Sequence, residues 1–279
     1  MESGLFWGDA LALMPTLPSA CVDLAIVDPP YNLNKDFHGY TFSVLAQSEY
    51  LAYVRSWMSE LARLLRPGAS LYICTEWRGS AAVQMAAAEW FTVRNRITWE
   101  REKGRGSSRN WKNSSEDIWF CTKGDDYFFD IDAVKLRRDV RAPYRDQQGT
   151  ARDWTEDEIT GGKWRDTCPS NLWTDLTVPF WSMPENTDHP TQKPEKLVAK
   201  LILASSQAGD LVFDPFAGSG TSLAVAKKLG RRWLGVEQHP LYAALAMKRL
   251  ELAESNTSIQ GYEKGVFWER NSALRKKGR

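Results

Sequence analysis

The run Val22–Val27 is the stretch that most constrains how this chain can fold. Its mostly apolar residues, rich in valine and isoleucine, indicate a buried strand, and the next four residues are Asp28-Pro29-Pro30-Tyr31. A proline cannot donate to a sheet ladder and fixes its own φ, so the chain must turn here. We therefore expect Asp28 and Tyr31 at the carboxyl end of a strand, which is the edge of an open α/β sheet where ligands bind.

The chemistry of this turn suits a flat base that carries an exocyclic amine. The Asp28 carboxylate and the Pro29 carbonyl can accept the hydrogens of the amine, and the ring of Tyr31 can stack on the base. An ordinary turn at the end of a strand is an equally good interpretation of these four residues alone.

A second strand and turn lie near the other end of the chain. The apolar run 211–213 predicts a strand, Asp214 follows it, and Gly218-Ser219-Gly220 predicts a tight turn before a helix. The glycines allow close approach of a ligand, and the helix start offers free N–H groups. The dinucleotide fingerprint needs a third glycine that is absent here, which disfavours a nucleotide-dependent oxidoreductase. Asp214 disfavours a pyrophosphate and suits a cationic group such as an α-ammonium.

The following strand ends at Glu237. An acid at that place typically accepts hydrogen bonds from ribose hydroxyls. An amino acid joined to a ribose describes S-adenosylmethionine. The two patterns together therefore predict a methyl donor that faces a base-like acceptor.

The motifs at residues 28–31 (Asp-Pro-Pro-Tyr) and 214–221 (Asp-Pro-Phe-Ala-Gly-Ser-Gly-Thr) resemble those of the amino-methylating DNA methyltransferases. The acceptor motif precedes the cofactor motif, which resembles the circular permutation of their β class. The segment 189–194, His-Pro-Thr-Gln-Lys-Pro, also resembles that class. The resemblance covers about residues 1–122 and 187–254. It implies a doubly wound, mostly parallel α/β sheet of the S-adenosylmethionine-dependent, Rossmann-like type, circularly permuted and with an inserted target-recognition module.

The resemblance also implies the residues of the site. The catalytic group would be Asp28, Pro29, Pro30 and Tyr31. The cofactor-binding group would be Asp9, His189, Thr191, Lys193, Asp214, Phe216, Gly218, Ser219, Gly220, Thr221 and Glu237. A helix cap is the alternative role for Asp9, and a turn before the next helix is the alternative for residues 189–193. We expect His239 to be a structural residue at a helix start, and we assign no role to His38.

The domain organisation follows from where regular periodicity is lost. We expect an acceptor half at 1–124, a target-recognition insert at 125–186, a cofactor-binding half at 187–256, and a mobile basic tail at 257–279. Predicted strands are 5–9, 22–27, 69–75, 91–99, 118–122, 211–213 and 232–236. Predicted helices are 10–13, 48–65, 80–89, 194–206, 220–229 and 240–253, and 32–48 is expected to be a loop over the site. Ser48 is the expected N-cap of its helix.

Charge and cysteine usage limit the class of protein further. The net charge of +1 gives no general attraction for nucleic acid, so DNA binding must depend on local basic stretches at 101–112, with Trp111, and at 135–145, with Tyr144. A solvated charged face is the alternative for each of them. The four cysteines lack metal-ligand or redox spacing, so we expect no metal site and reduced thiols in a cytoplasmic protein. The resemblance implies a bacterial, archaeal or phage origin. We find no signal peptide and no membrane-spanning stretch.

The expected function is methylation of the exocyclic N6 of a flipped-out adenine in a specific DNA sequence, with S-adenosylmethionine as cofactor. Aspartate as the first residue of the acceptor turn resembles the adenine-specific enzymes. Cytosine N4 is the nearest alternative, and RNA or a protein amide is a more distant acceptor. A silent DNA-binding protein is disfavoured by the intact Asp28 and Asp214. The expected partner is double-stranded DNA and not a membrane; a homodimer and a cognate restriction endonuclease remain open.

Overall fold

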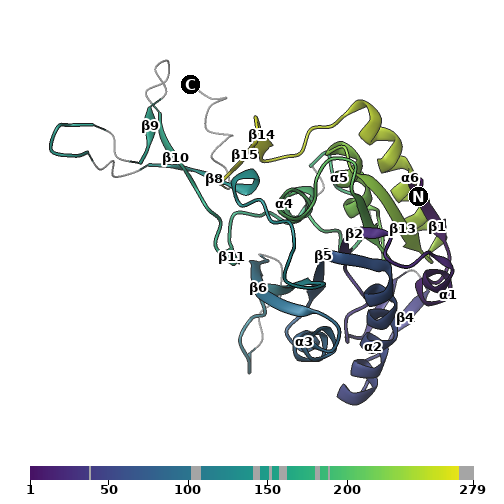
Figure 1. The fold of residues 1–279 in the computed structure, drawn as a ribbon. Coiled ribbons are helices and arrows are strands. Elements are labelled where there is room, and N and C mark those ends of the chain that lie inside the picture. Colours follow the sequence, from purple (N-terminus) through teal and green to yellow (C-terminus); the bar gives the residue numbers. More distant parts are fainter. Residues whose placement is uncertain are drawn as a thin grey trace.

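An eight-stranded sheet runs through the molecule and carries helices on both of its faces (Figure 1). The computed structural model describes residues 1–269 except 38, 102–107, 141–144, 151–152, 157–161, 180–182 and 188. In spatial order the strands are β1 (Gly4–Trp7), β13 (Arg232–Glu237), β12 (Leu211–Asp214), β2 (Val22–Val27), β5 (Leu65–Thr75), β7 (Ser115–Thr122), β6 (Thr92–Glu100) and β11 (Leu172–Trp173). β7 is antiparallel to both of its neighbours, and all other neighbouring pairs are parallel. The mostly parallel α/β sheet expected from the sequence is confirmed.

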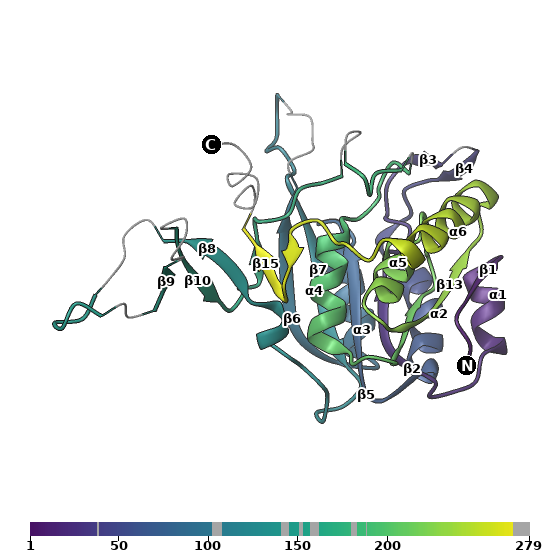
Figure 2. The same ribbon diagram turned by 90° about the horizontal axis from the view of Figure 1, so that it is seen from above.

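The two helical layers follow from alternation along the buried strands. In β2, Ala25 and Val27 belong to one core cluster, and Leu24 and Ile26 belong to the other. The first cluster includes side chains of α1 (Ala10–Leu13), α2 (Gln47–Leu64) and α3 (Ser80–Ala88). The second includes α4 (Glu195–Ser205) and α5 (Thr221–Lys228), and α6 (Pro240–Ser255) packs beside α5. Figure 2 shows the sheet between these layers.

A second, five-stranded sheet projects from this body, on the left in Figure 1. Its order is β14 (Tyr262–Glu263), β15 (Val266–Trp268), β8 (Leu136–Asp139), β10 (Lys163–Thr167) and β9 (Thr155–Glu156). A short 3-10 helix, Asp132–Val134, precedes β8. The expected insert thus contains regular structure, and its last strand, β11, belongs to the main sheet because it pairs with β6.

The expectation of a mobile tail from 257 onward is wrong for the part of it that the structure describes. β15 pairs in parallel with β8, and the side chain of Phe267 is fully buried in the core beneath α4. Burial of this ring explains why the segment is ordered, since its few apolar residues pack on a distant element rather than on each other. Residues 270–279, which hold the terminal basic run, lie outside the described residues.

Two local expectations also differ from the structure. The segment expected to be a loop contains a hairpin, β3 (Lys35–Phe37) and β4 (Tyr40–Phe42). His38 lies outside the described residues. Helix α2 begins at Gln47 rather than after Ser48, because the Glu49 carboxylate reaches back to accept the Ala46 N–H at 2.9 Å. No helix in the described ranges combines the length and apolar character needed to cross a bilayer.

Candidate active site

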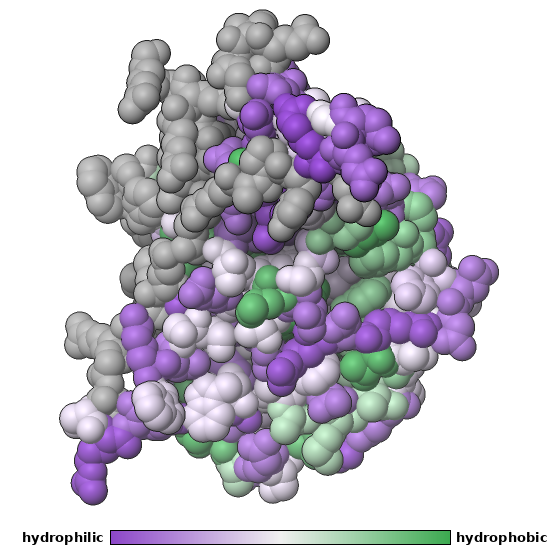
Figure 3. Space-filling view, turned by 90° about the vertical axis from the view of Figure 1, so that its left-hand side faces the viewer, coloured by the Kyte–Doolittle hydropathy of each residue, from purple (hydrophilic) through white to green (hydrophobic). Residues whose placement is uncertain are grey.

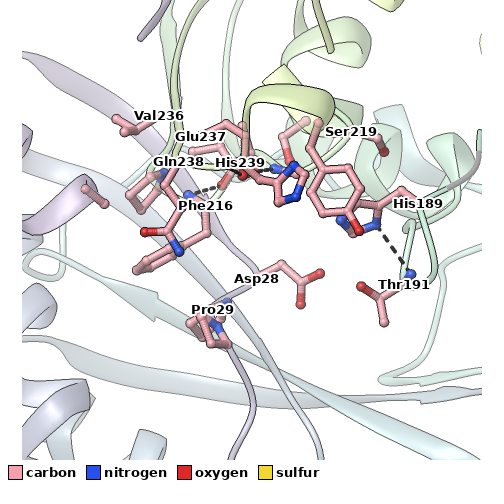
Figure 4. Close-up of a pocket in the computed structure, with 18 of the residues that line it drawn as sticks. Asp28, Pro29, His189, Thr191, Phe216, Ser219, Val236, Glu237, Gln238 and His239 are labelled. Atoms are coloured by element: carbon pink, nitrogen blue, oxygen red, sulfur yellow. Dashed lines mark hydrogen bonds between the residues drawn. The ribbon is translucent and has the colours of Figure 1, made fainter. Parts of the chain in front are cut away.

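A cavity of about 380 Å³ opens at the carboxyl edge of the main sheet. Strands β1, β13, β12 and β2 end at this edge, and the segment before α4 crosses it. The cavity is lined by every site residue expected from the sequence except Gly220: Asp9, Asp28, Pro29, Pro30, Tyr31, His189, Thr191, Lys193, Asp214, Phe216, Gly218, Ser219, Thr221 and Glu237. In Figure 4, Asp28 and Pro29 lie on one side of the cavity, and Val236, Glu237 and His239 lie on the other. The fold therefore brings the two motifs together.

Both carboxylate oxygens of Asp28 are hydrogen-bonded. The Tyr31 hydroxyl donates to Oδ1 at 2.8 Å, and the Lys193 ammonium group donates to Oδ2 at 2.7 Å. Lys193 also donates to the Tyr31 hydroxyl oxygen at 3.1 Å. Lys193 was expected at the amino-acid end of the cofactor, and the structure instead places its charge on the acceptor turn. The side chain crosses to that turn because the segment before α4 lies directly over the end of β2.

Sequence reasoning missed Glu116, the fourth member of this network. Its Oε2 accepts the Tyr31 hydroxyl at 3.2 Å and lies 3.3 Å from the Lys193 ammonium nitrogen, while Oε1 pairs with Arg101. Glu116 reaches the site because β7 is antiparallel, so that the start of this strand lies at the edge where the parallel strands end. An acid just before an apolar run was the only signal in the sequence, and it does not reveal the strand direction.

The charges in this network are set by burial and by each other. Burial disfavours the ammonium form of Lys193, but the carboxylates of Asp28 and Glu116 outweigh it and raise its pKa. Burial, with the same two carboxylates, raises the pKa of Tyr31 well above its ordinary value, so its hydroxyl remains a donor. The network is thus a cluster of two cations, two carboxylates and one phenol, in which Nε of Arg101 is buried without a hydrogen-bond partner among the described residues.

On the other side of the cavity, Asp214 is 3% exposed at the end of β12. Its Oδ1 accepts the Phe216 N–H at 3.0 Å. Burial raises the pKa of Asp214 to about 7, so a cationic ligand group beside it would favour the ionised form. This environment fits the ammonium or sulfonium group of an amino-acid ligand.

Glu237 connects the glycine turn with the start of α6. Its Oε2 accepts the Gly218 N–H at 2.7 Å, and its Oε1 accepts the His239 N–H at 2.7 Å. Burial raises the pKa of Glu237. Each oxygen keeps a second lone pair, so the carboxylate can still accept a hydroxyl from a ligand in the cavity.

The two glycines of the turn have different roles. Gly218 has φ 53°, and a Cβ there would lie 3.1 Å from Nε2 of His189, so the segment before α4 closes tightly on this glycine. Gly220 has φ 75°, and its Cβ would lie 2.6 Å from Cβ of Ala246 in α6. Gly220 therefore allows the turn to pack on α6, which explains why it does not line the cavity.

Three polar residues at helix starts and turns complete the wall. Asp9 accepts the Leu11 N–H at 2.7 Å and also lines the cavity, so it caps α1 while facing the ligand space. His239 caps α6 by accepting the Leu241 N–H at 3.2 Å, which confirms the expected structural role. Thr221 accepts from Arg249 at 2.7 Å, which ties the start of α5 to α6.

The volume and the lining together fit S-adenosylmethionine. The cavity is within the range of ordinary small-molecule sites, about 300–1,000 Å³. Buried carboxylates stand at the ends of β12 and β13, and the glycine turn between them leaves room for close backbone approach.

Comparisons with known proteins agree with this geometry. The sequence model of the family described as DNA methylase matches residues 22–248. The DNA adenine methyltransferase YhdJ of Escherichia coli (strain K12) is 31% identical over 251 residues, which are 88% of this chain and 82% of that protein. The type II methyltransferase M.HpaI of Haemophilus parainfluenzae is 31% identical over 254 residues, 90% of this chain and 75% of that protein.

Solved structures share the fold. The PvuII DNA methyltransferase (cytosine-N4-specific) has a TM-score of 0.66 at 19% identity and covers 91% of each chain. The Thermus thermophilus protein TTHA0409, complexed with S-adenosyl-L-methionine, has a TM-score of 0.61 at 24% identity, over 97% of this chain and 99% of that one. The chain therefore belongs to the DNA methylase family and has the fold of the S-adenosylmethionine-dependent methyltransferases, whose methyl donor is S-adenosylmethionine.

Proposed function

We propose that this protein transfers a methyl group from S-adenosylmethionine to the exocyclic N6 of adenine in a specific sequence of double-stranded DNA. The observation that carries the proposal is the shared cavity. The turn that begins with Asp28 lines the same cavity as Asp214 and Glu237. The order of the chain, with β2 before β12, supports a circularly permuted member of the family.

Adenine is favoured over cytosine by two observations. The relative YhdJ is by name a DNA adenine methyltransferase, and the acceptor turn begins with aspartate. Cytosine N4 is the second candidate, because the PvuII enzyme, which is cytosine-N4-specific by name, shares the fold. A carboxylate accepts hydrogens from either amine, so the physical chemistry of Asp28 does not separate the two bases.

The acceptor residues act on an amine that is a poor nucleophile. Its lone pair is delocalised into the ring, and hydrogen bonds to Asp28 and to the Pro29 carbonyl would localise it and stabilise the positive charge that develops on nitrogen. S-Adenosylmethionine supplies an electrophilic methyl group on a sulfonium. Each Asp28 oxygen has one donor, the Tyr31 hydroxyl or the Lys193 ammonium group, and keeps a second lone pair that can accept the target amine.

The resemblance to the family assigns the cofactor contacts, and the cavity lining is compatible with it. Asp214, Phe216 and Gly218 would surround the methionine part, Glu237 would accept the ribose hydroxyls, and Asp9 would face the adenine. These residues all line the same cavity, at the ends of β12, β13 and β1.

Recognition of a DNA sequence is assigned to the second sheet. Figure 3 looks at the side from which this sheet projects, and hydrophilic and intermediate residues cover most of its described surface. Arg138 and Arg165 are exposed there on neighbouring strands, β8 and β10, and Arg165 also pairs with Asp153 at 2.9 Å. Such cations suit phosphates and base edges. M.HpaI is named a type II methyltransferase, which supports pairing with a restriction endonuclease of the same specificity.

The test is chemical identification of the product. Purified protein, S-adenosylmethionine and unmethylated genomic DNA are incubated, and the hydrolysed nucleosides are identified by mass spectrometry, with Asp28→Ala as control. N6-methyladenine that depends on Asp28 is expected. N4-methylcytosine alone would establish the second candidate, and neither product from protein that binds S-adenosylmethionine would refute both.

A further inference from the structure

Trp111 is the most exposed large hydrophobic side chain that the structure describes, at 93%. It lies in the segment that joins β6 to β7, between two cationic residues, Arg109 and Lys112. Because this indole ring is almost entirely exposed to water, its burial contributes almost nothing to the folding free energy of this protein. Its flanking charges are the kind that contact phosphates.

This segment leaves and returns at the edge that carries the acceptor site. Glu100, the last residue of β6, pairs with Ser115 at the start of β7, and the Arg101 N–H donates to the Ser114 carbonyl at 2.6 Å. Arg101 lines the cavity and pairs with Glu116. DNA whose base enters the cavity therefore approaches the edge from which the segment that carries Trp111 extends.

We propose that Trp111 enters the DNA duplex at the position that the target base leaves and stacks in its place. The proposal rests on the proposed function, because only an acceptor buried in a duplex requires a base to be extruded. Extrusion leaves a gap and removes stacking from the orphaned partner base. Apolar side chains insert between base steps in architectural DNA-binding proteins, and an aromatic face stacks on any base.

Three other exposed tryptophans show why the assignment falls on Trp111. Trp77 follows β5 at the same edge, is 58% exposed, and has the Arg78 guanidinium 5.3 Å from its ring centroid. Trp90 is 50% exposed but precedes β6, so it lies at the opposite edge of the sheet. Trp7, at the end of β1, is 71% exposed, but its indole N–H donates to the Gln238 carbonyl at 3.0 Å. Trp77 is thus the competing wedge, and Trp90 is the matched control.

The experiment separates base extrusion from methyl transfer. The substrate is a duplex oligonucleotide that holds the methylated sequence, found by sequencing modified DNA, with 2-aminopurine in place of the target base. Its fluorescence rises when the base leaves the stack. We expect Trp111→Ala to reduce this rise and kcat/KM on matched duplex by about tenfold or more, whereas Trp111→Phe and Trp90→Ala retain both.

A second substrate makes the result specific. When the target lies opposite an abasic site there is no partner base to restack, so Trp111→Ala should regain most of the parent's kcat/KM. Calorimetric affinity for S-adenosylmethionine should be unchanged, which excludes a folding defect.

Three outcomes would overturn the inference: parent-like extrusion by Trp111→Ala, an equal loss on the abasic substrate, or loss in Trp77→Ala instead. A parent protein that methylates no DNA would instead refute the proposed function, and this inference with it.

Discussion

The Lys193 ammonium nitrogen lies 2.7 Å from Oδ2 of Asp28, although the two residues are 165 positions apart in the chain. This ion pair joins the segment before α4 to the acceptor turn after β2. It also occupies one of the two oxygens that the proposed function assigns to the target amine. We therefore expect the contribution of Lys193 to appear in methyl transfer rather than in cofactor affinity.

Lys193→Met should behave like Asp28→Ala and unlike Asp214→Ala. It leaves Asp28 and Glu116 close together without their shared cation, so we expect unfolding free energy to fall by about 3 kcal/mol. We expect kcat to fall by about a hundredfold, the effect of a misplaced reacting group. Calorimetry with S-adenosylmethionine is the decisive measurement, made below the melting temperature of the variant. If Lys193→Met weakened the binding of S-adenosylmethionine as much as Asp214→Ala does, Lys193 would instead be a cofactor-binding residue.

Glu116→Gln tests whether the network acts as one unit. The substitution keeps the shape of the side chain but removes the charge that faces Tyr31, Lys193 and Arg101. We expect a lower kcat and, in combination with Lys193→Met, a loss clearly smaller than the sum of the two single losses in activation free energy. The measurement is a double-mutant cycle on kcat. Additive losses would show that Glu116 and Lys193 act independently.

Asp214 should make cofactor binding depend on pH. Burial raises its pKa to about 7, and a cationic ligand prefers the ionised carboxylate. Affinity for S-adenosylmethionine should therefore rise as pH increases through about 7. Titrations between pH 6 and 8 measure this, and Asp214→Asn should abolish the dependence. An unchanged pH profile in that variant would mean that another group titrates.

The raised pKa of Asp214 should make the stability of the ligand-free protein fall with rising pH, whereas cofactor affinity rises. A carboxyl with a raised folded-state pKa binds more protons when folded than when unfolded, so its contribution to stability falls as pH rises from about 4 to about 7. Asp214→Asn should flatten this part of the curve of unfolding free energy against pH.

Gly220→Ala should destabilise the protein through packing as well as backbone strain. Its φ is 75°, and the added methyl would lie 2.6 Å from Cβ of Ala246. We expect a loss of about 3 kcal/mol in unfolding free energy. Gly209→Ala is the matched control, because Gly209 has φ 84° but nothing within 4 Å of the added methyl. It should cost about 1 kcal/mol. Equal losses in denaturant titrations would mean that the contact with Ala246 relaxes freely.

Arg138 and Arg137 should have different effects on DNA binding, although they are adjacent in β8. Arg138 is exposed, whereas Arg137 pairs with Asp166 at 2.6 Å. Arg138→Ala should weaken DNA binding and lower the slope of log affinity against log salt by about one. Arg137→Ala should chiefly destabilise the second sheet. DNA binding measured over a salt series, with thermal unfolding of both variants, distinguishes these effects. An unchanged slope for Arg138→Ala would show that Arg138 does not contact DNA. Arg141, in the same basic stretch, lies outside the described residues.

The sequence by itself determined the two halves of the site and the class of fold. The strand before Asp28 and the strand before Asp214 are short apolar runs that end in turn residues, and these signals are local. Parallel strands meet at one edge whatever their spacing in the chain, so two local patterns were enough to predict that Asp28, Asp214 and Glu237 share a cavity.

Only the tertiary structure decided what completes that site. Glu116 lies at the edge because β7 is antiparallel, and strand direction depends on which neighbours the strand pairs with, not on its own residues. Lys193 reaches Asp28 because the segment before α4 crosses the end of β2. Phe267 is ordered because it is buried beneath an element far away in the sequence. Each of these outcomes depends on contacts between distant residues, and the free energy of such contacts leaves no local pattern from which to predict them.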